Sequence, residues 1–227
     1  MKWYVIQVSL GLSLIGCIHR YPSPDNTKPM YGEIPKSADY QMVDEEFIDT
    51  AMKEFTSREE AAKFYVARAW QHVWQDSLDI AMKRFNQAWL LDPRNPDCFW
   101  GFGVLTERKG NDTEAVRFLD LGLALDSTHV GINTEMATYF ANKALTEKGP
   151  QAISDANEAV AYMERVVRHH PEDTASYVTL ATANYYAGHL YDAWTAVHKY
   201  ESLAGNPIDQ NLRHALELAM RDPLQSP

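Results

Sequence analysis

The chain repeats its own pattern of large and small residues at an interval of 34 positions. The first copy of the pattern consists of Tyr65, Ala69, Ala81, Phe85, Ala88 and Pro93. The second copy consists of Phe99, Gly103, Ala115, Leu119, Gly122 and Ser127. Adding 34 to each position of the first copy gives the second copy without a gap. Each alanine of the first copy corresponds to an alanine or a glycine in the second. A fixed internal period of this length is typical of stacked units, none of which can bury its apolar face alone.

The segments between these positions have the periodicity of helices. From about Val43 onward, apolar residues recur every three or four positions, and no alternating strand pattern is present. Ser57 followed by Glu60 forms a capping box, which indicates a helix start. Helix ends are indicated by Gly110, Gly149 and Gly188. The sequence therefore predicts an all-α fold.

The 34-residue register resembles the tetratricopeptide (TPR) repeat, whose pattern is W-x2-L-G-x2-Y…A-x3-F…P. The resemblance implies a right-handed α-solenoid of about four helical hairpins with capping helices at its ends. The TPR domain would span 42–227, with repeats at approximately 62–95, 96–129, 130–173 and 174–206, and a C-terminal cap at 207–221. The third repeat is longer than the others, which predicts two long helices over 130–147 and 151–169.

The N-terminus has the pattern of an export signal. Lys2 precedes an apolar run of about 13 residues, which is too short to cross a bilayer but fits the core of a secretory signal. The run ends in Leu14-Ile15-Gly16-Cys17, which resembles the lipobox of bacterial lipoproteins. The resemblance implies a signal peptide over 1–16 and a Cys17 that carries acyl chains such as palmitate. A buried core helix is the alternative interpretation.

A proline-rich segment, 17–41, follows the lipobox and shows no periodicity. We expect it to be a tether between the membrane and the folded domain. The alternative is that it packs on the domain, with Tyr31 and Tyr40 as its contacts. Ile18, the residue after the lipobox cysteine, favours the outer membrane, with the domain facing the periplasm.

Charge and composition exclude several kinds of function. The net charge of −10 disfavours a nucleic-acid partner. The eight histidines do not have metal-ligand spacing, so no metal or cofactor is expected. His72 and Cys98 lie at positions typical of helix packing. No catalytic constellation is visible, and the sequence predicts a protein that is not an enzyme.

The TPR resemblance implies that fixed positions on the first helix of each repeat line a concave groove. Some TPR domains hold a peptide carboxylate with a clamp of Lys, Asn and Arg at set groove positions, and that clamp is absent here. The groove positions instead carry five aromatic residues, which we predict to bind a partner: Trp70, Trp74, Trp100, Tyr185 and Tyr186. The alternative is that several of them pack as core against an extra N-terminal helix at about 43–55.

Lipobox, tether and repeats together resemble the TPR lipoproteins of bacterial envelopes. This resemblance implies a lipid-anchored scaffold or adaptor that binds another envelope protein or an extended peptide, in an assembly, pilotin-like or hydrolase-adaptor role. The alternative is an enzyme or a receptor for a small molecule such as a glycan fragment. Buried carboxylates converging on Trp70 and Trp74 would favour that alternative.

Overall fold

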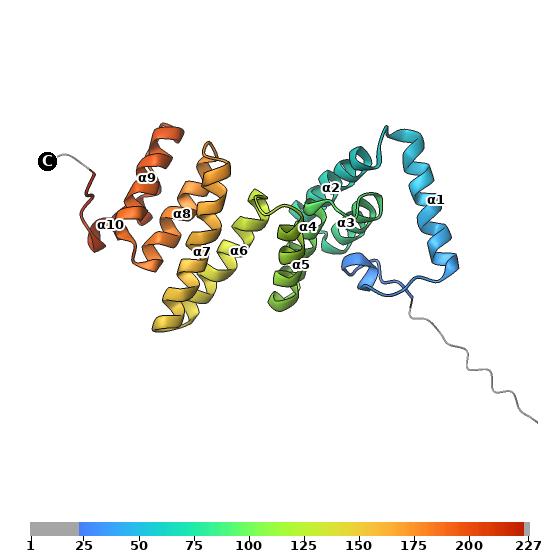
Figure 1. Cartoon of the computed structure of the whole chain (residues 1–227), viewed down its shortest axis with the longest axis horizontal. Coiled ribbons are helices and arrows are strands. Elements are labelled where there is room, and N and C mark those ends of the chain that lie inside the picture. Colours follow the sequence, from blue (N-terminus) through green and yellow to red (C-terminus); the bar gives the residue numbers. More distant parts are fainter. Residues whose placement is uncertain (1–22, 225–227) are drawn as a thin grey trace, which may run out of the picture.

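The computed structural model describes residues 23–224 of the chain. The predicted signal peptide over 1–16 and the predicted lipidation site at Cys17 lie outside the described residues. Within that range the chain forms one short 3-10 helix, η1, and ten α-helices, with no β-strand. The helices follow one another in an elongated array (Figure 1).

The helix bounds are as follows. The N-terminal part comprises η1 (Pro29–Gly32), α1 (Ala38–Glu54), α2 (Arg58–Trp74), α3 (Leu78–Leu91), α4 (Pro96–Arg108) and α5 (Asp112–Leu125). The C-terminal part comprises α6 (Val130–Thr146), α7 (Pro150–His169), α8 (Thr174–Ala187), α9 (Leu190–Ala204) and α10 (Gln210–Ala219). Four helical hairpins result, each made of two consecutive helices in contact: α2–α3, α4–α5, α6–α7 and α8–α9. The predicted all-α array of hairpins is confirmed.

Local sequence signals begin and end these helices as expected. The Ser57 hydroxyl accepts a hydrogen bond from the Glu60 backbone N–H at 3.1 Å, which satisfies one of the free donors at the start of α2. Asn95 caps α4 in the same way by accepting from the Asp97 N–H at 2.9 Å. Gly188 ends α8 with a left-handed backbone, φ 79°, which favours glycine.

Small residues at the crossing points allow the two helices of a hairpin to approach closely. Ala69 and Ala81, on facing helices of the first hairpin, are both fully buried. In the second hairpin, a Cβ on Gly103 would lie 2.6 Å from Cδ2 of Leu119. The repeated alanine and glycine positions are therefore a packing requirement of the array.

The core is divided along the array, as is usual for a repeat protein. The N-terminal core cluster is built from α1 to α5 around residues such as Phe85 and Phe102. The C-terminal core cluster is built from α6 to α10 around Trp194 and Leu216. A small bridging cluster of Leu119, Ile132 and Met136 connects the two where α5 meets α6.

The third hairpin is longer than the others, in agreement with the sequence. Helix α6 has 17 residues and α7 has 20, whereas the helices of the second hairpin have 13 and 14. Between α6 and α7, the buried Asp155 carboxylate lies 3.3 Å from the Lys143 ammonium.

No helix among residues 23–224 is long and apolar enough to cross a membrane.

The N-terminal segment differs from the prediction. Residues 23–36, which we call the N-terminal strap, lie against α3 and the second hairpin. The buried Asn86 side chain donates to the backbone oxygens of Asn26 and Lys28, at 3.3 and 2.9 Å. Tyr31 is only 8% exposed. The predicted tether is therefore wrong for this segment, and the packed alternative holds through Tyr31.

Two further differences concern the same region. Helix α1 begins at Ala38, so the last residues of the predicted tether are helical and Tyr40 lies on α1. The strap is also tied to the second hairpin, because the Lys109 ammonium donates to the Thr27 backbone oxygen at 3.1 Å. These contacts join residues about 60 to 80 positions apart, so no local pattern in the sequence announces them.

Candidate functional site on the inner face

The first helices of the hairpins form a continuous row. Helix α2 contacts α4, α4 contacts α6, and α6 contacts α8. We call the surface that this row presents the inner face, because it carries the positions that the TPR pattern places in the concave groove. A continuous row of this kind can hold an extended ligand across several repeats.

Trp70 of α2 and Trp100 of α4 meet on this face. Their ring centroids are 4.3 Å apart and their planes are inclined by 49°. We call these two residues the tryptophan pair. Behind the pair, the buried Phe85 ring of α3 meets Trp70 edge to face at 5.3 Å. Both indoles are half-buried, so each is held by packing and still presents part of its surface to solvent.

Helix α6 fixes Trp100 from the other side. A Cβ on Gly131 would lie 2.6 Å from the Trp100 ring, so the missing side chain leaves the room that the indole fills. The indole N–H of Trp100 donates to a carboxylate oxygen of Glu135 at 3.4 Å. Trp100 therefore packs across the junction between the second and third repeats as well as presenting a surface.

His129 holds the start of α6 beside the same ring. Its Nδ1 accepts a hydrogen bond from the Ile132 backbone N–H at 3.1 Å, and its Nε2 lies 3.0 Å from the Asp97 carboxylate. Because Nδ1 accepts, the proton is on Nε2, which donates to Asp97. The imidazole caps α6 and holds it against α4, and its ring lies 5.5 Å from that of Trp100.

The carboxylates near the pair have distinct environments. Burial raises the pKa of Glu135, and the nearby Glu107 raises it further, while the Trp100 indole and the Arg108 guanidinium oppose the shift. Glu107 itself is exposed and lines an open hollow of about 190 Å³ together with Tyr139 and Asn142. Arg108 donates to the Val73 backbone oxygen at 3.3 Å, which ties α4 to the end of α2.

The other predicted groove aromatics are placed separately. Trp74 is the last residue of α2 and is 78% exposed. Tyr185 and Tyr186 lie on α8 with ring centroids 5.3 Å apart. Tyr185 packs against the C-terminal core cluster, whereas Tyr186 is exposed. Of the five aromatics, the structure brings Trp70 and Trp100 together as one pair and Tyr185 and Tyr186 as another.

Two residues of the site were not singled out in the sequence. Glu135 lies one repeat plus one position after Trp100, so the repeat spacing could have placed it beside the indole. His129 precedes α6 as its N-cap, and in the sequence it is one of eight histidines that lack metal-ligand spacing. Neither carries a motif by which single-sequence reasoning selects it.

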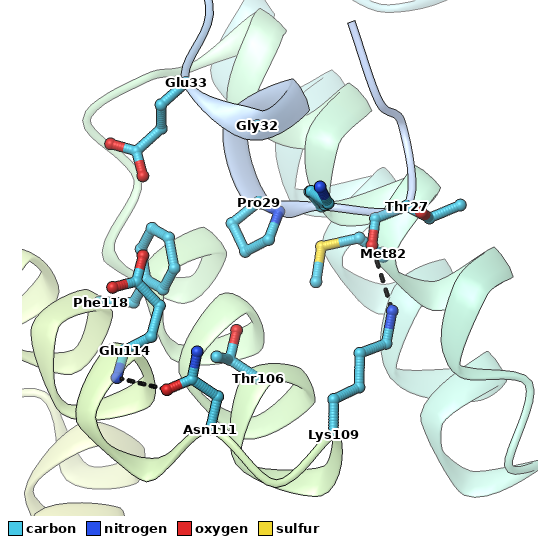
Figure 2. A pocket seen from close by; sticks show the side chains of 11 residues that line it. Thr27, Pro29, Gly32, Glu33, Met82, Thr106, Lys109, Asn111, Glu114 and Phe118 are labelled. Atoms are coloured by element: carbon cyan, nitrogen blue, oxygen red, sulfur yellow. Dashed lines mark hydrogen bonds between the residues drawn. The ribbon is translucent and has the colours of Figure 1, made fainter.

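A second hollow, of about 500 Å³, lies under the strap (Figure 2). Pro29, Met82 and Phe118 form its apolar part, and Lys109 and Glu114 lie at its edge. The charged groups are already matched, because Lys109 lies 3.0 Å from an Asp79 oxygen and Glu114 pairs with Arg117 at 2.6 Å. Lys109 and Glu114 are therefore already paired within the protein and are not free to bind a charged ligand.

Within residues 23–224, no group of three or more histidine, cysteine, aspartate or glutamate side chains is arranged to hold a metal ion. Cys98 is fully buried in α4, and burial raises the pKa of its thiol well above the usual value. A thiol in that environment is inert as a nucleophile. The chemistry that the inner face offers is therefore contact through aromatic surface and carboxylates.

Comparison with known proteins defines the fold. No family model matches the chain, and no curated protein matches it in sequence. Among solved structures, PilW, described as a widely conserved type IV pilus biogenesis factor, is similar with a TM-score of 0.55 and 22% identity, over 78% of this chain and 76% of that one. MamA from Desulfovibrio magneticus RS-1 is similar with a TM-score of 0.53 and 18% identity, over 70% and 82%.

These neighbours are TPR proteins, and the described residues form the same kind of helical-hairpin array. The predicted all-α TPR solenoid is confirmed. At identities below 25%, the likeness defines the fold, and the function has to be argued from the surface.

Proposed function

We propose that this chain is a non-enzymatic, lipid-anchored TPR scaffold that binds an extended segment of another cell-envelope protein on its inner face. The observation that carries the proposal is the tryptophan pair, two half-buried indoles in contact where α2 meets α4 in a continuous row of helices. The lipobox at Cys17 supports the anchor, and Ile18 supports the outer membrane, facing the periplasm.

Aromatic anchors suit this task for a physical reason. A free segment loses conformational entropy when it becomes ordered on binding, so the groove must supply concentrated apolar contact. Trp70 and Trp100 are already held by Phe85, Gly131 and Glu135, so little further side-chain entropy is lost on binding. Rigid, partly exposed tryptophans of this kind dominate binding hot spots.

Within this class we favour an assembly role. PilW is described as a pilus biogenesis factor, and this chain shares its fold over about three quarters of both chains. An adaptor for a periplasmic hydrolase would use the same inner face.

The alternative of a glycan receptor or an enzyme requires carboxylates that converge on Trp70 and Trp74. In the described residues, Glu135 is the half-buried carboxyl beside the pair, and it contacts Trp100. Glu107 is exposed, and Trp74 stands apart in solvent. This arrangement gives that alternative less support than it gives the scaffold.

Affinity capture from crosslinked envelopes tests the proposal. We expect Trp100→Ala to reduce the amount of partner captured, with a loss of about 30-fold in affinity at a hot spot, which corresponds to about 2 kcal/mol, and Trp74→Ala to reduce it by less. Trp74→Ala should leave thermal unfolding unchanged because the ring is exposed. Trp100→Ala should lower the melting temperature modestly, since its ring also packs on α6.

Lys83→Ala is the matched control on an exposed position of α3, outside the inner face, and should capture the partner normally. If both tryptophan variants remain helical and capture the partner as well as the natural chain does, binding on the inner face is refuted.

A further inference from the structure

Helix α1 has an apolar stripe that only its second half uses. Phe47, Ile48 and Ala51 pack against the N-terminal core cluster. One to two turns earlier, Tyr40 and Val43 are exposed, Val43 by 61%. Because Tyr40, Val43 and Phe47 are spaced three and four residues apart, they lie on one face of the helix. The first half of α1 therefore presents an apolar face without a neighbouring helix.

This face forms one wall of a groove. Tyr40, Val43 and Phe47 line a hollow of about 360 Å³ whose opposite wall is α3, through Gln87 and Leu90. A second hollow of about 520 Å³ is lined mostly by the strap and shares Lys36, Asp44 and Leu90 with the first. We call the first hollow the α1–α3 groove. It has the size of pockets that bind ligands.

The strap forms the floor of the groove and fixes its width. Tyr31 and Lys36 of the strap line the first hollow. The Lys36 ammonium lies 3.5 Å from the centre of the Tyr31 ring and pairs with the Asp44 carboxylate of α1. These contacts hold α1 away from α3, so the groove is built into the fold.

The wall on α1 is negatively charged. The helix has one lysine and six carboxylates: Asp39, Asp44, Glu45, Glu46, Asp49 and Glu54. Asp39 and Glu46 are exposed and lie four residues before and three after Val43, so both lie beside Val43 on the same side of the apolar stripe. The α3 wall adds Arg84, whose guanidinium is hydrogen-bonded to Gln87 at 2.7 Å. The exposed negative charge is thus on the α1 side.

We propose that the α1–α3 groove binds a basic amphipathic helix of a partner protein. Its apolar residues would enter between α1 and α3, and its lysines or arginines would face Asp39 and Glu46. A helix is the fitting occupant because α1 presents apolar residues at helical spacing, against which the apolar stripe of a second helix can pack as ridges pack into grooves. A second copy of this chain is disfavoured, since it would place acidic α1 against acidic α1 in a protein of net charge −10. The groove is separate from the inner face, so this interaction goes beyond the proposed function.

The test uses the full chain and two labelled 18-residue peptides, read by fluorescence anisotropy. One has leucines at helical i, i+3, i+4, i+7 spacing with lysines elsewhere, and the other replaces every lysine by glutamate. We expect the lysine peptide alone to bind. Val43→Ala should weaken it by about 5- to 10-fold, as expected for lost burial of one apolar side chain. Asp39→Asn together with Glu46→Gln should weaken it and flatten its salt dependence.

Met42→Ala is the matched control. Met42 adjoins Val43 and is equally exposed, at 60%, but does not line the groove. Its substitution should leave affinity unchanged, as should Trp100→Ala on the inner face. The proposal is overturned if neither peptide binds, if both bind alike, if Met42→Ala or Trp100→Ala weakens binding as much as Val43→Ala, or if the chain forms a dimer that Val43→Ala dissociates.

Discussion

Phe85→Ala is expected to lower the free energy of unfolding by about 3–5 kcal/mol. Phe85 is fully buried in α3, where it supports Trp70 at 5.3 Å and meets the Phe102 ring at 6.4 Å. Its ring also occupies the room left by Gly101, where a Cβ would lie 2.3 Å from it. Truncation leaves a cavity bounded by two helices, and a repeat that contacts only its neighbours has few ways to fill it.

Urea unfolding followed by far-UV circular dichroism measures this loss. Phe64→Ala on α2 is the control, because Phe64 is 47% exposed and its truncation should cost less than about 1 kcal/mol. Hydrogen exchange should rise most in α2 to α5 and least in α8 and α9, since the two core clusters are largely separate. A loss below about 1 kcal/mol for Phe85→Ala would contradict the packing described.

Cys17→Ala is expected to move the protein out of the membrane fraction or to leave it as an uncleaved precursor. Two or three acyl chains hold a protein to a membrane far more firmly than one, at about 0.8 kcal/mol for each buried CH₂ group. Cys98→Ala is the control, because Cys98 is buried in α4 and has no part in anchoring. Membrane fractionation followed by immunoblotting measures both variants.

A mature Cys17→Ala protein that fractionates normally would contradict the predicted lipid anchor.

The packing of the strap also alters the expected distance between the array and the membrane. Ser23, the first residue described, is six positions after Cys17, and six extended residues span at most about 20 Å. An acylated Cys17 would therefore hold the array closer to the bilayer than a free coil over the whole predicted tether, 17–41, would.

The repeat architecture could be predicted because it depends on local patterns. The pairs Ala81 and Ala115, and Ala69 and Gly103, keep the 34-residue register since each marks a crossing point between helices. Capping at Ser57 and the long third hairpin could be predicted for the same reason. Such signals lie within one hairpin, so a single sequence reveals them.

The rest depends on contacts between distant segments. The strap is held by Asn86, some 60 residues away, and its prolines look the same in a free tether and in a packed one. The inner-face positions were taken from a repeat pattern that does not specify exposure. It could not show that Trp74 stands in solvent while Trp100 is packed on Gly131. How much of an aromatic side chain is exposed depends on the residues that the neighbouring repeat packs against it.

Site-specific photocrosslinking in living cells tests the central claim most directly. A benzophenone amino acid is placed at Thr138, an exposed residue of α6 that lies two 34-residue periods after Trp70, or at Lys83 on α3. We expect a discrete adduct from Thr138 that Trp100→Ala strongly reduces and Val43→Ala leaves unchanged, and none from Lys83. An adduct from Thr138 that persists undiminished in a folded Trp100→Ala chain, or one that forms only from Lys83, would contradict it.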